Sequence, residues 1–305
     1  MSGMTDRSVL SEQHHGLVSL VKARDAGMNY EQVRHRIARG EWERLYEEVY
    51  LVVGVPRSWK TLLLAACWAG GPEAVASHGS AAALWDLAGG RVDQVEITCP
   101  RWRRAKEVGL VVHESKALDP ADCRVVDNIP VTSPELTLLI LGAVCSPLVV
   151  EMALDTALRR NLLTYESTRE LLHRIGRRGR NGAGVLRAVL AERVPERAIP
   201  ESPMETRLLW LLRRLGFPEP VPQYEVRHRG EFYGRLDAAY PVQRVGVEFQ
   251  SIEHHTGKVA ILRDNDRIKR FQAIEWEIVP VTVEDFRNHG CLLAPALHTA
   301  LRRAV

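Results

Sequence analysis

The stretch that decides the fold of the C-terminal third is DAAYPVQRVGVEFQ, residues 237–250. Ten residues separate Asp237 from Glu248, and the pair Tyr240-Pro241 between them predicts a turn between two strands. Apolar residues alternate with Gly246 and Glu248 in the second strand, so Asp237 and Glu248 are expected to meet across the hairpin. Two carboxylates at one point can hold a hard divalent cation.

A carboxylate flanked by apolar strand residues is costly to bury without a partner. A cation or a basic side chain is therefore expected beside these acids. The alternative to a metal site is an ordinary salt bridge, such as Asp237 with Arg235 or Arg267.

The residues before and after the hairpin predict an α/β sandwich over residues 202–305. Ser202 opens an apolar helix, and Glu205 stands at the spacing of a capping box. Alternation and breaker residues predict the other elements: strands over 223–229, 232–239, 244–250 and 275–281, and helices over 258–273 and 293–304.

This region resembles the PD-(D/E)XK nuclease superfamily, and within it the domains similar to the very-short-patch repair endonuclease. The likeness is carried by four stretches: SPMETRLLWLLRRLGFPEPVPQYEV (202–226), GRLDAAYP (234–241), VGVEFQSIEHH (245–255) and RDNDRIKRFQAIEWEIVPVT (263–282). The resemblance implies a restriction-endonuclease-like sandwich in which Asp237 and Glu248 bind Mg²⁺ and Glu205 is an auxiliary acid.

By the same resemblance, Gln250 stands where the motif has a catalytic lysine. Glutamine can orient the attacking water only by hydrogen bonding. His254 or His255 could act as the general base, because imidazole titrates near neutral pH. Arg267 or Lys269 could supply the missing positive charge and contact DNA. The histidine pair can equally be a surface turn.

The first 57 residues predict a small DNA-binding unit. Glycine stops and cap residues divide the segment into helices over 9–15, 22–26 and 30–39, followed by strands over 42–46 and 49–53. Three helices and a two-stranded ribbon are the order of a winged helix-turn-helix, whose last helix enters the major groove. Its cationic residues are Arg34, His35, Arg36 and Arg39. The alternative is a helical subdomain whose arginines face water.

This segment resembles the N-terminal winged helix of AbiEi-type antitoxins of type IV toxin–antitoxin systems. The matching residues are HHGLVSL (14–20), DAGMNYEQVRHRIARGEWERL (25–45) and EEVYLV (47–52). The resemblance implies DNA as a ligand and a cognate toxin as a partner. The chain has Glu47-Glu48 where such proteins have Arg-Gly, and two acids would repel phosphate.

Residues 58–193 predict a mixed α/β connector domain. Helices are expected over 59–69, 77–87, 134–143 and 146–159, and strands over 95–99 and 110–112. The pieces SHGSAAALWDL (77–87) and IPVTSPELTLLIL (129–141) resemble the middle region of the same antitoxin-like proteins. His78 and Ser80 are assigned to helix capping or packing, because no third catalytic partner can be placed. Three prolines in residues 194–203 mark the next domain boundary.

Composition narrows the class of protein. A net charge of +3 is mildly basic, so a nucleic-acid surface must come from local clustering. Five scattered cysteines without a CxxC pair argue against a disulfide framework or a zinc site and fit a reducing cytoplasm. The most apolar run is interrupted by Pro147, so no membrane span is expected.

The sequence therefore predicts an α+β multidomain DNA-binding protein. In the first hypothesis, the C-terminal domain hydrolyses DNA phosphodiesters with Mg²⁺, in phage defence or DNA repair. In the alternative, a degenerate nuclease fold serves a non-catalytic, antitoxin-like transcriptional regulator.

Overall fold

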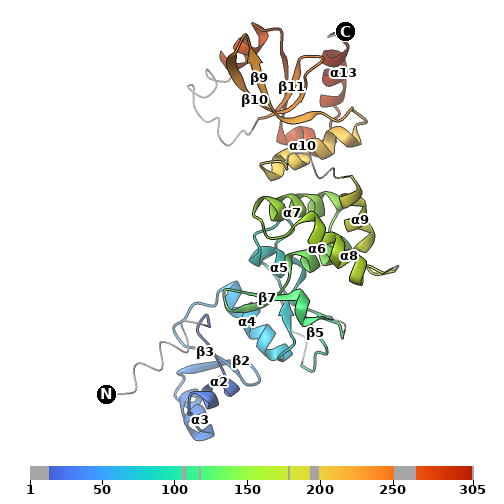
Figure 1. The fold of residues 1–305 in the computed structure, drawn as a ribbon. Coiled ribbons are helices and arrows are strands. Elements are labelled where there is room, and N and C mark those ends of the chain that lie inside the picture. The colour runs from blue at the N-terminus through green and yellow to red at the C-terminus, as the bar shows by residue number, and fades with distance from the viewer. Residues whose placement is uncertain are drawn as a thin grey trace. The chain divides into compact units, whose positions relative to one another are not determined.

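The computed structural model describes residues 14–104, 108–116, 118–177, 179–192, 199–250 and 266–303. These residues form a mixed α+β protein with sheets of three, five and four strands, which confirms the predicted class (Figure 1). The chain divides into two compact units, Met1–Arg193 and Val194–Val305. No helix among the described residues is long and apolar enough to cross a membrane.

The N-terminal unit begins with two short helices and a three-stranded sheet. The elements are β1 (Leu17–Ser19), α2 (Leu20–Asp25), α3 (Tyr30–Ala38), β2 (Trp42–Tyr46) and β3 (Val49–Val52). The expected caps are confirmed: Ser19 accepts from the Lys22 amide, and Asn29 and Gln32 form a reciprocal capping box. The sheet order β1-β3-β2 places the unexpected strand β1 beside β3. Residues 9–13 of the first expected helix lie outside the described residues.

This sheet shares a core with the next helix and with a five-stranded sheet. Leu17 and Leu51 pack in the same cluster as Leu63 and Ile97, so the predicted boundary after residue 57 falls inside one unit. The sheet order is β6-β5-β4-β8-β7. The elements are α4 (Trp59–Gly70), β4 (Val75–Ala76), α5 (His78–Leu84), β5 (Val95–Cys99), β6 (Leu110–Glu114), β7 (Cys123–Val126) and β8 (Ile129–Thr132).

Four helices complete the unit: α6 (Pro134–Val144), α7 (Pro147–Arg159), α8 (Tyr165–Ile175) and α9 (Ala183–Ala191). The contact of α6 with the start of α9 depends on glycine. A Cβ on Gly142 would lie 2.6 Å from the carbonyl oxygen of Gly182. Gly182 has φ +82°, and a Cβ there would lie 2.0 Å from the carbonyl oxygen of Leu139.

The C-terminal unit packs helices on a four-stranded sheet of order β12-β11-β10-β9. Strands β9, β10 and β11 are antiparallel, and β12 runs parallel to β11. One core joins Leu208 and Leu212 to Val245 and Val247. The elements are α10 (Pro203–Arg214), β9 (Val221–His228), β10 (Glu231–Tyr240), β11 (Val245–Phe249), helical residues 266–272, β12 (Glu277–Val281), α12 (Val283–Arg287) and α13 (Leu293–Arg303).

Candidate functional site

Asp237 lies in β10 where this strand runs antiparallel to β11. Ala238 pairs with Val247, so Asp237 and Glu248 occupy the next positions along the two strands. The backbone amide of Phe249 donates to Oδ2 of Asp237 at 2.8 Å. The two acids predicted to face each other are therefore neighbours across the hairpin, and one Asp237 oxygen is bound to the backbone of β11.

The expected alternation along β10 is wrong at one pair of residues. Simple alternation predicts that Leu236 and Ala238 share a face of the sheet. Leu236 instead packs with Phe271, whereas Ala238 packs with Val247 in the other core cluster. The alternating pattern therefore does not hold through Asp237.

The Asp237 carboxyl lies in an environment that disfavours its charge. Burial raises the pKa of Asp237 above its usual value, and the nearby Glu205 carboxylate raises it further. The hydrogen bond from Phe249 and the charges of Arg267 and Arg235 lower the pKa, but they do not outweigh burial. A carboxyl with a raised pKa is typical of functional sites and also occurs in structural ion-pair networks.

Arg267 supplies the positive charge beside Glu248. Its Nη2 donates to Oε1 of Glu248 at 2.5 Å and to the carbonyl of Arg235 at 2.7 Å. The guanidinium also lies 5.6 Å from the ring centre of Phe271. Arg235 binds Glu201 through two hydrogen bonds of 2.8 and 2.7 Å. The sequence offers a salt bridge of Asp237 with Arg235 or Arg267 as an alternative. In the structure Arg267 pairs with Glu248, and Arg235 pairs with Glu201.

Glu205 takes part in capping α10, but without the predicted bond to the cap amide of Ser202. Oγ of Ser202 accepts from the Glu205 amide at 3.2 Å, and the Ser202 hydroxyl donates to the Glu205 carboxylate at 3.0 Å. The second carboxylate oxygen accepts from the amide of Glu201 at 2.8 Å, one residue before the expected cap amide. Glu205 is thus buried and held by the start of α10, and its charge still reaches Asp237.

The remaining predicted residues of this region are only partly placed. The amide of Gln250 donates to the carbonyl of Val281 at 2.7 Å, directly after β11. Lys269 is exposed on the helical segment that also carries Arg267. His254 and His255 lie outside the described residues, so their roles stay predictions.

The described arrangement fits magnesium poorly. A divalent cation at this site would balance the charge of Glu248, but Arg267 already does so. The oxygens of Glu205, Asp237 and Glu248, all among the described residues, do not form a trio within 4.8 Å. A metal could enter this site only if Arg267 withdrew from Glu248.

The second predicted site is the cationic helix α3. Arg34 and Arg39 are each 64% exposed, and their acidic partners Glu31 and Glu41 lie at 3.6 and 3.5 Å. His35 is also exposed. Ion pairs of exposed arginines at these distances contribute little to stability, so both guanidiniums can exchange partners.

Arg36 differs from its neighbours on the same helix. Its side chain is 21% exposed and donates to Glu41 at 3.2 Å. Its guanidinium lies 5.5 Å from the ring centre of Trp42, the first residue of β2. The structure therefore gives Arg36 a packing role between α3 and β2.

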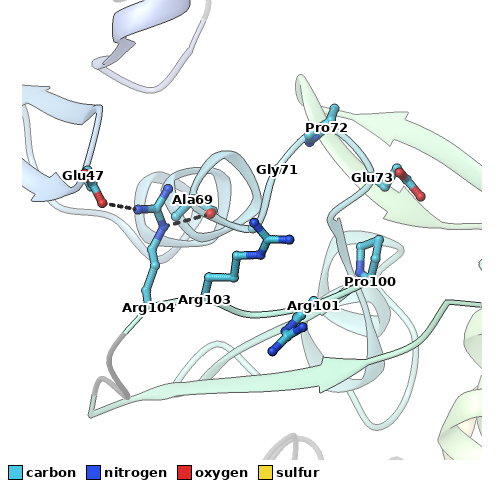
Figure 2. Close-up of a pocket in the computed structure, with 10 residues that line it drawn as sticks. Glu47, Ala69, Gly71, Pro72, Glu73, Pro100, Arg101, Arg103 and Arg104 are labelled. Atoms are coloured by element: carbon cyan, nitrogen blue, oxygen red, sulfur yellow. Dashed lines mark hydrogen bonds and ion pairs between the residues drawn. The ribbon is translucent and has the colours of Figure 1, made fainter.

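A basic hollow lies beside the turn between β2 and β3. It has a volume of about 490 Å³, and Arg101, Arg103 and Arg104 line it along the stretch that leaves β5 (Figure 2). Arg104 donates to Glu47 at 3.2 Å and to the carbonyl of Ala69 at 2.9 Å (Figure 2). One of the two acids in the turn, Glu47, is thus paired with an arginine of the same unit.

Comparisons with known proteins identify relatives of this chain. No protein-family model matches the sequence. The uncharacterized proteins Rv2248 and MT2308 of two Mycobacterium tuberculosis strains are each 31% identical over 234 residues, covering 77% of this chain and 83% of the relative. This chain belongs to the Rv2248 family. The crystal structure of Rv2827c from M. tuberculosis covers 67% of this chain and 79% of its own, at 16% identity and a TM-score of 0.39.

In this member of the Rv2248 family, the fold brings together one further group of polar residues that the sequence pattern does not reveal. His78, Glu96 and His113 meet in the N-terminal unit, with ligand atoms within 4.8 Å of one another. Burial and the charge of His113 lower the pKa of His78 to about 4, against an opposing effect of Glu96. Their meeting depends on the parallel pairing of β5 with β6, which no residue pattern specifies.

Proposed function

We propose that this protein binds duplex DNA through α3 and the β2–β3 hairpin, as a winged helix-turn-helix. The observation that carries the proposal is the exposure of Arg34 on α3 and of Arg39 at its C-cap, directly before a two-stranded hairpin. A helix with exposed guanidiniums can enter the major groove and bind both phosphates and guanine edges.

The hydrogen bonds around α3 support a rigid recognition element. The capping box of Asn29 and Gln32 fixes the start of the helix, and Val33 is buried beneath it. Arg36 ties the helix to Trp42 and Glu41. Arg34 and Arg39 therefore project from a backbone that is already ordered, which lowers the entropy lost on binding.

The basic hollow is a second cationic surface of the same unit. Arg101 and Arg103 are exposed next to the β2–β3 turn. Non-specific contacts of arginine with phosphates provide much of the affinity of DNA-binding proteins. We assign these two arginines to the DNA backbone, and Arg34 with Arg39 to the groove.

The test is fluorescence anisotropy with a labelled duplex, together with footprinting on the DNA upstream of the protein's own gene. We expect saturable binding that Arg34→Ala with Arg39→Ala weakens at least about 10-fold. Arg124→Ala is the matched control, because this exposed arginine of β7 donates to carbonyls of its own loop. Absence of duplex binding, or equal losses in both variants, would overturn the proposal.

A second candidate function is phosphodiester hydrolysis by the C-terminal unit. It is favoured by the half-buried Asp237 carboxyl with its raised pKa and by Glu205 close to it. The Arg267–Glu248 bond argues against it. If this arginine stays in place, the unit is a degenerate nuclease fold, and the protein is a regulator that binds DNA without cutting it.

Incubation of the full chain with plasmid and single-stranded DNA in Mg²⁺ or Mn²⁺ separates these two functions. Cleavage that disappears in Asp237→Asn and Glu248→Gln would establish the hydrolase. A sharp footprint without cleavage would leave the regulator, and cleavage that persists in both variants would point to a contaminating nuclease.

A further inference from the structure

We propose that His78, Glu96 and His113 form a binding site for Zn²⁺ in the N-terminal unit. This site is independent of the DNA-binding proposal and of the acids in the C-terminal unit. It rests on three side chains of metal-binding type, brought together from α5, β5 and β6, with ligand atoms within 4.8 Å of one another.

The strand register explains why these residues meet. Strands β5 and β6 are parallel, and Thr98 pairs with His113. Glu96 lies two residues before Thr98, so Glu96, Thr98 and His113 lie on one face of the sheet. His78 is the first residue of α5, and the two imidazoles stack with ring centres 3.5 Å apart and planes 16° apart.

The spacing of these groups suits a small cation. Nε2 of His113 lies 3.3 Å from Oε2 of Glu96. Two ligands of a tetrahedral Zn²⁺ are about 3.4 Å apart when each metal–ligand bond is about 2.1 Å. The His113–Glu96 edge therefore already has the required length. The His78 ring is stacked on that of His113, so it must turn out of this stack to complete a three-ligand set.

Neighbouring groups hold these side chains in place. Nδ1 of His78 lies 2.9 Å from Oγ of Ser77, which also accepts from Oγ1 of Thr98 at 2.8 Å. This contact leaves Nε2 of His78 as the metal-ligating nitrogen. The backbone of Gly79 also binds the Glu96 carboxylate. Such outer contacts to ligating histidines and carboxylates are typical of zinc sites.

The chemistry of the ligands selects the metal. Two imidazoles and one carboxylate suit Zn²⁺ and related transition cations, whereas Mg²⁺ and Ca²⁺ prefer a set of oxygen ligands. His78 and Glu96 are buried, and the His113 side chain is 32% exposed. A cation could enter from the His113 side, and three protein ligands would leave it one position for water or another small ligand.

The experiment uses the full chain after dialysis against a chelator, with Co²⁺ as a spectroscopic substitute for Zn²⁺. We expect visible absorption bands that saturate at one ion per chain and are displaced by Zn²⁺ but not by Mg²⁺. Glu96→Gln and His113→Ala should each weaken binding at least about 100-fold. His173→Ala, at an exposed histidine of α8, is the control and should leave binding unchanged.

Absence of a saturating one-to-one complex would overturn the site, as would unchanged affinity in Glu96→Gln. Either variant could fail to fold, and a second measurement on the unchanged protein covers that outcome. The imidazole protons of His78 and His113 should shift in NMR spectra before those of other histidines as Zn²⁺ is added. A first response at any other histidine would also exclude this site.

Discussion

Arg267 binds Glu248 across 2.5 Å, from the helical segment 266–272 to the end of β11. The same guanidinium nitrogen donates to the carbonyl of Arg235 in β10. One side chain thus ties a helix to both strands of the hairpin that carries Asp237 and Glu248. Its charge balances that of Glu248, so Arg267 occupies the position beside the hairpin to which a cation would otherwise be attracted.

Arg267→Gln should lower the free energy of unfolding by about 1–3 kcal/mol, because it leaves the half-buried Glu248 carboxylate without its charged donor. Arg227→Gln is the matched control, since the pair of Arg227 with Glu225 is exposed on both sides and should contribute under about 1 kcal/mol. Urea denaturation of the two variants measures the difference. Equal losses would show that Arg267 does not stabilise the acid cluster.

Asp237→Asn should leave the protein at least as stable as the unchanged chain at neutral pH. The pKa of Asp237 is raised in the folded state, chiefly by burial, so its favourable contribution is present below the ordinary pKa of 3.8. That contribution is lost as the pH rises through the folded value, where the half-buried carboxyl becomes charged. Asparagine has no charge and can still accept from the Phe249 amide.

The advantage of the asparagine variant should therefore shrink as the pH falls towards 3.8. Asp93→Asn is the control of opposite sign, because a hydrogen bond and the charge of Arg91 lower the pKa of Asp93. The charged Asp93 carboxylate stabilises the folded state above its ordinary pKa, and this stabilisation is lost on acidification. Denaturant titrations across this range check both slopes, and a loss of stability for Asp237→Asn at neutral pH would contradict the expectation.

Local patterns predict the elements of this chain well where one residue type sets a boundary. The bounds of β2 and β5 agree with the sequence pattern residue for residue, and the caps Ser19, Asn29 and Ser202 lie where the sequence places them. Each of these signals acts within four residues. The same reasoning misses β4, because a strand of two residues carries no measurable alternation.

The candidate sites show more clearly what the sequence alone does not predict. The sequence correctly places Asp237 opposite Glu248 in the strand register, because a hairpin fixes its own register. It does not predict the partner of Glu248, since the choice between two arginines depends on how a separate helix packs on the sheet. The sequence places no partner beside His78 for the same reason: Glu96 and His113 reach it through a parallel pairing that no local pattern encodes.

Gly182→Ala should destabilise the N-terminal unit by about 3 kcal/mol or more. The residue has φ +82°, and an added Cβ would lie 2.0 Å from the carbonyl oxygen of Leu139, a backbone atom of α6 that cannot move aside easily. Gly179→Ala is the control, because it has φ +87° with nothing within 4 Å of the added carbon. It should cost about 1–2 kcal/mol from the backbone alone. Thermal unfolding that ranks the two variants equally would contradict the close approach of α6 and α9.

The arginines of α3 should differ in their effect on the salt dependence of DNA binding. Arg34 and Arg39 are largely exposed, so each can release a phosphate counterion on binding. Replacing either by alanine should reduce the slope of log K against log salt by roughly 0.9, and the double variant by about twice that amount.

Arg36→Ala should behave in the opposite way. Because Arg36 donates to Glu41 and stacks on Trp42, its loss should lower the stability of the unit and leave the salt slope nearly unchanged. Anisotropy titrations at several salt concentrations, with urea denaturation of the same variants, separate the two effects. If Arg36→Ala alone changed the slope while Arg34→Ala and Arg39→Ala did not, the exposed face of α3 would not be the surface that contacts DNA.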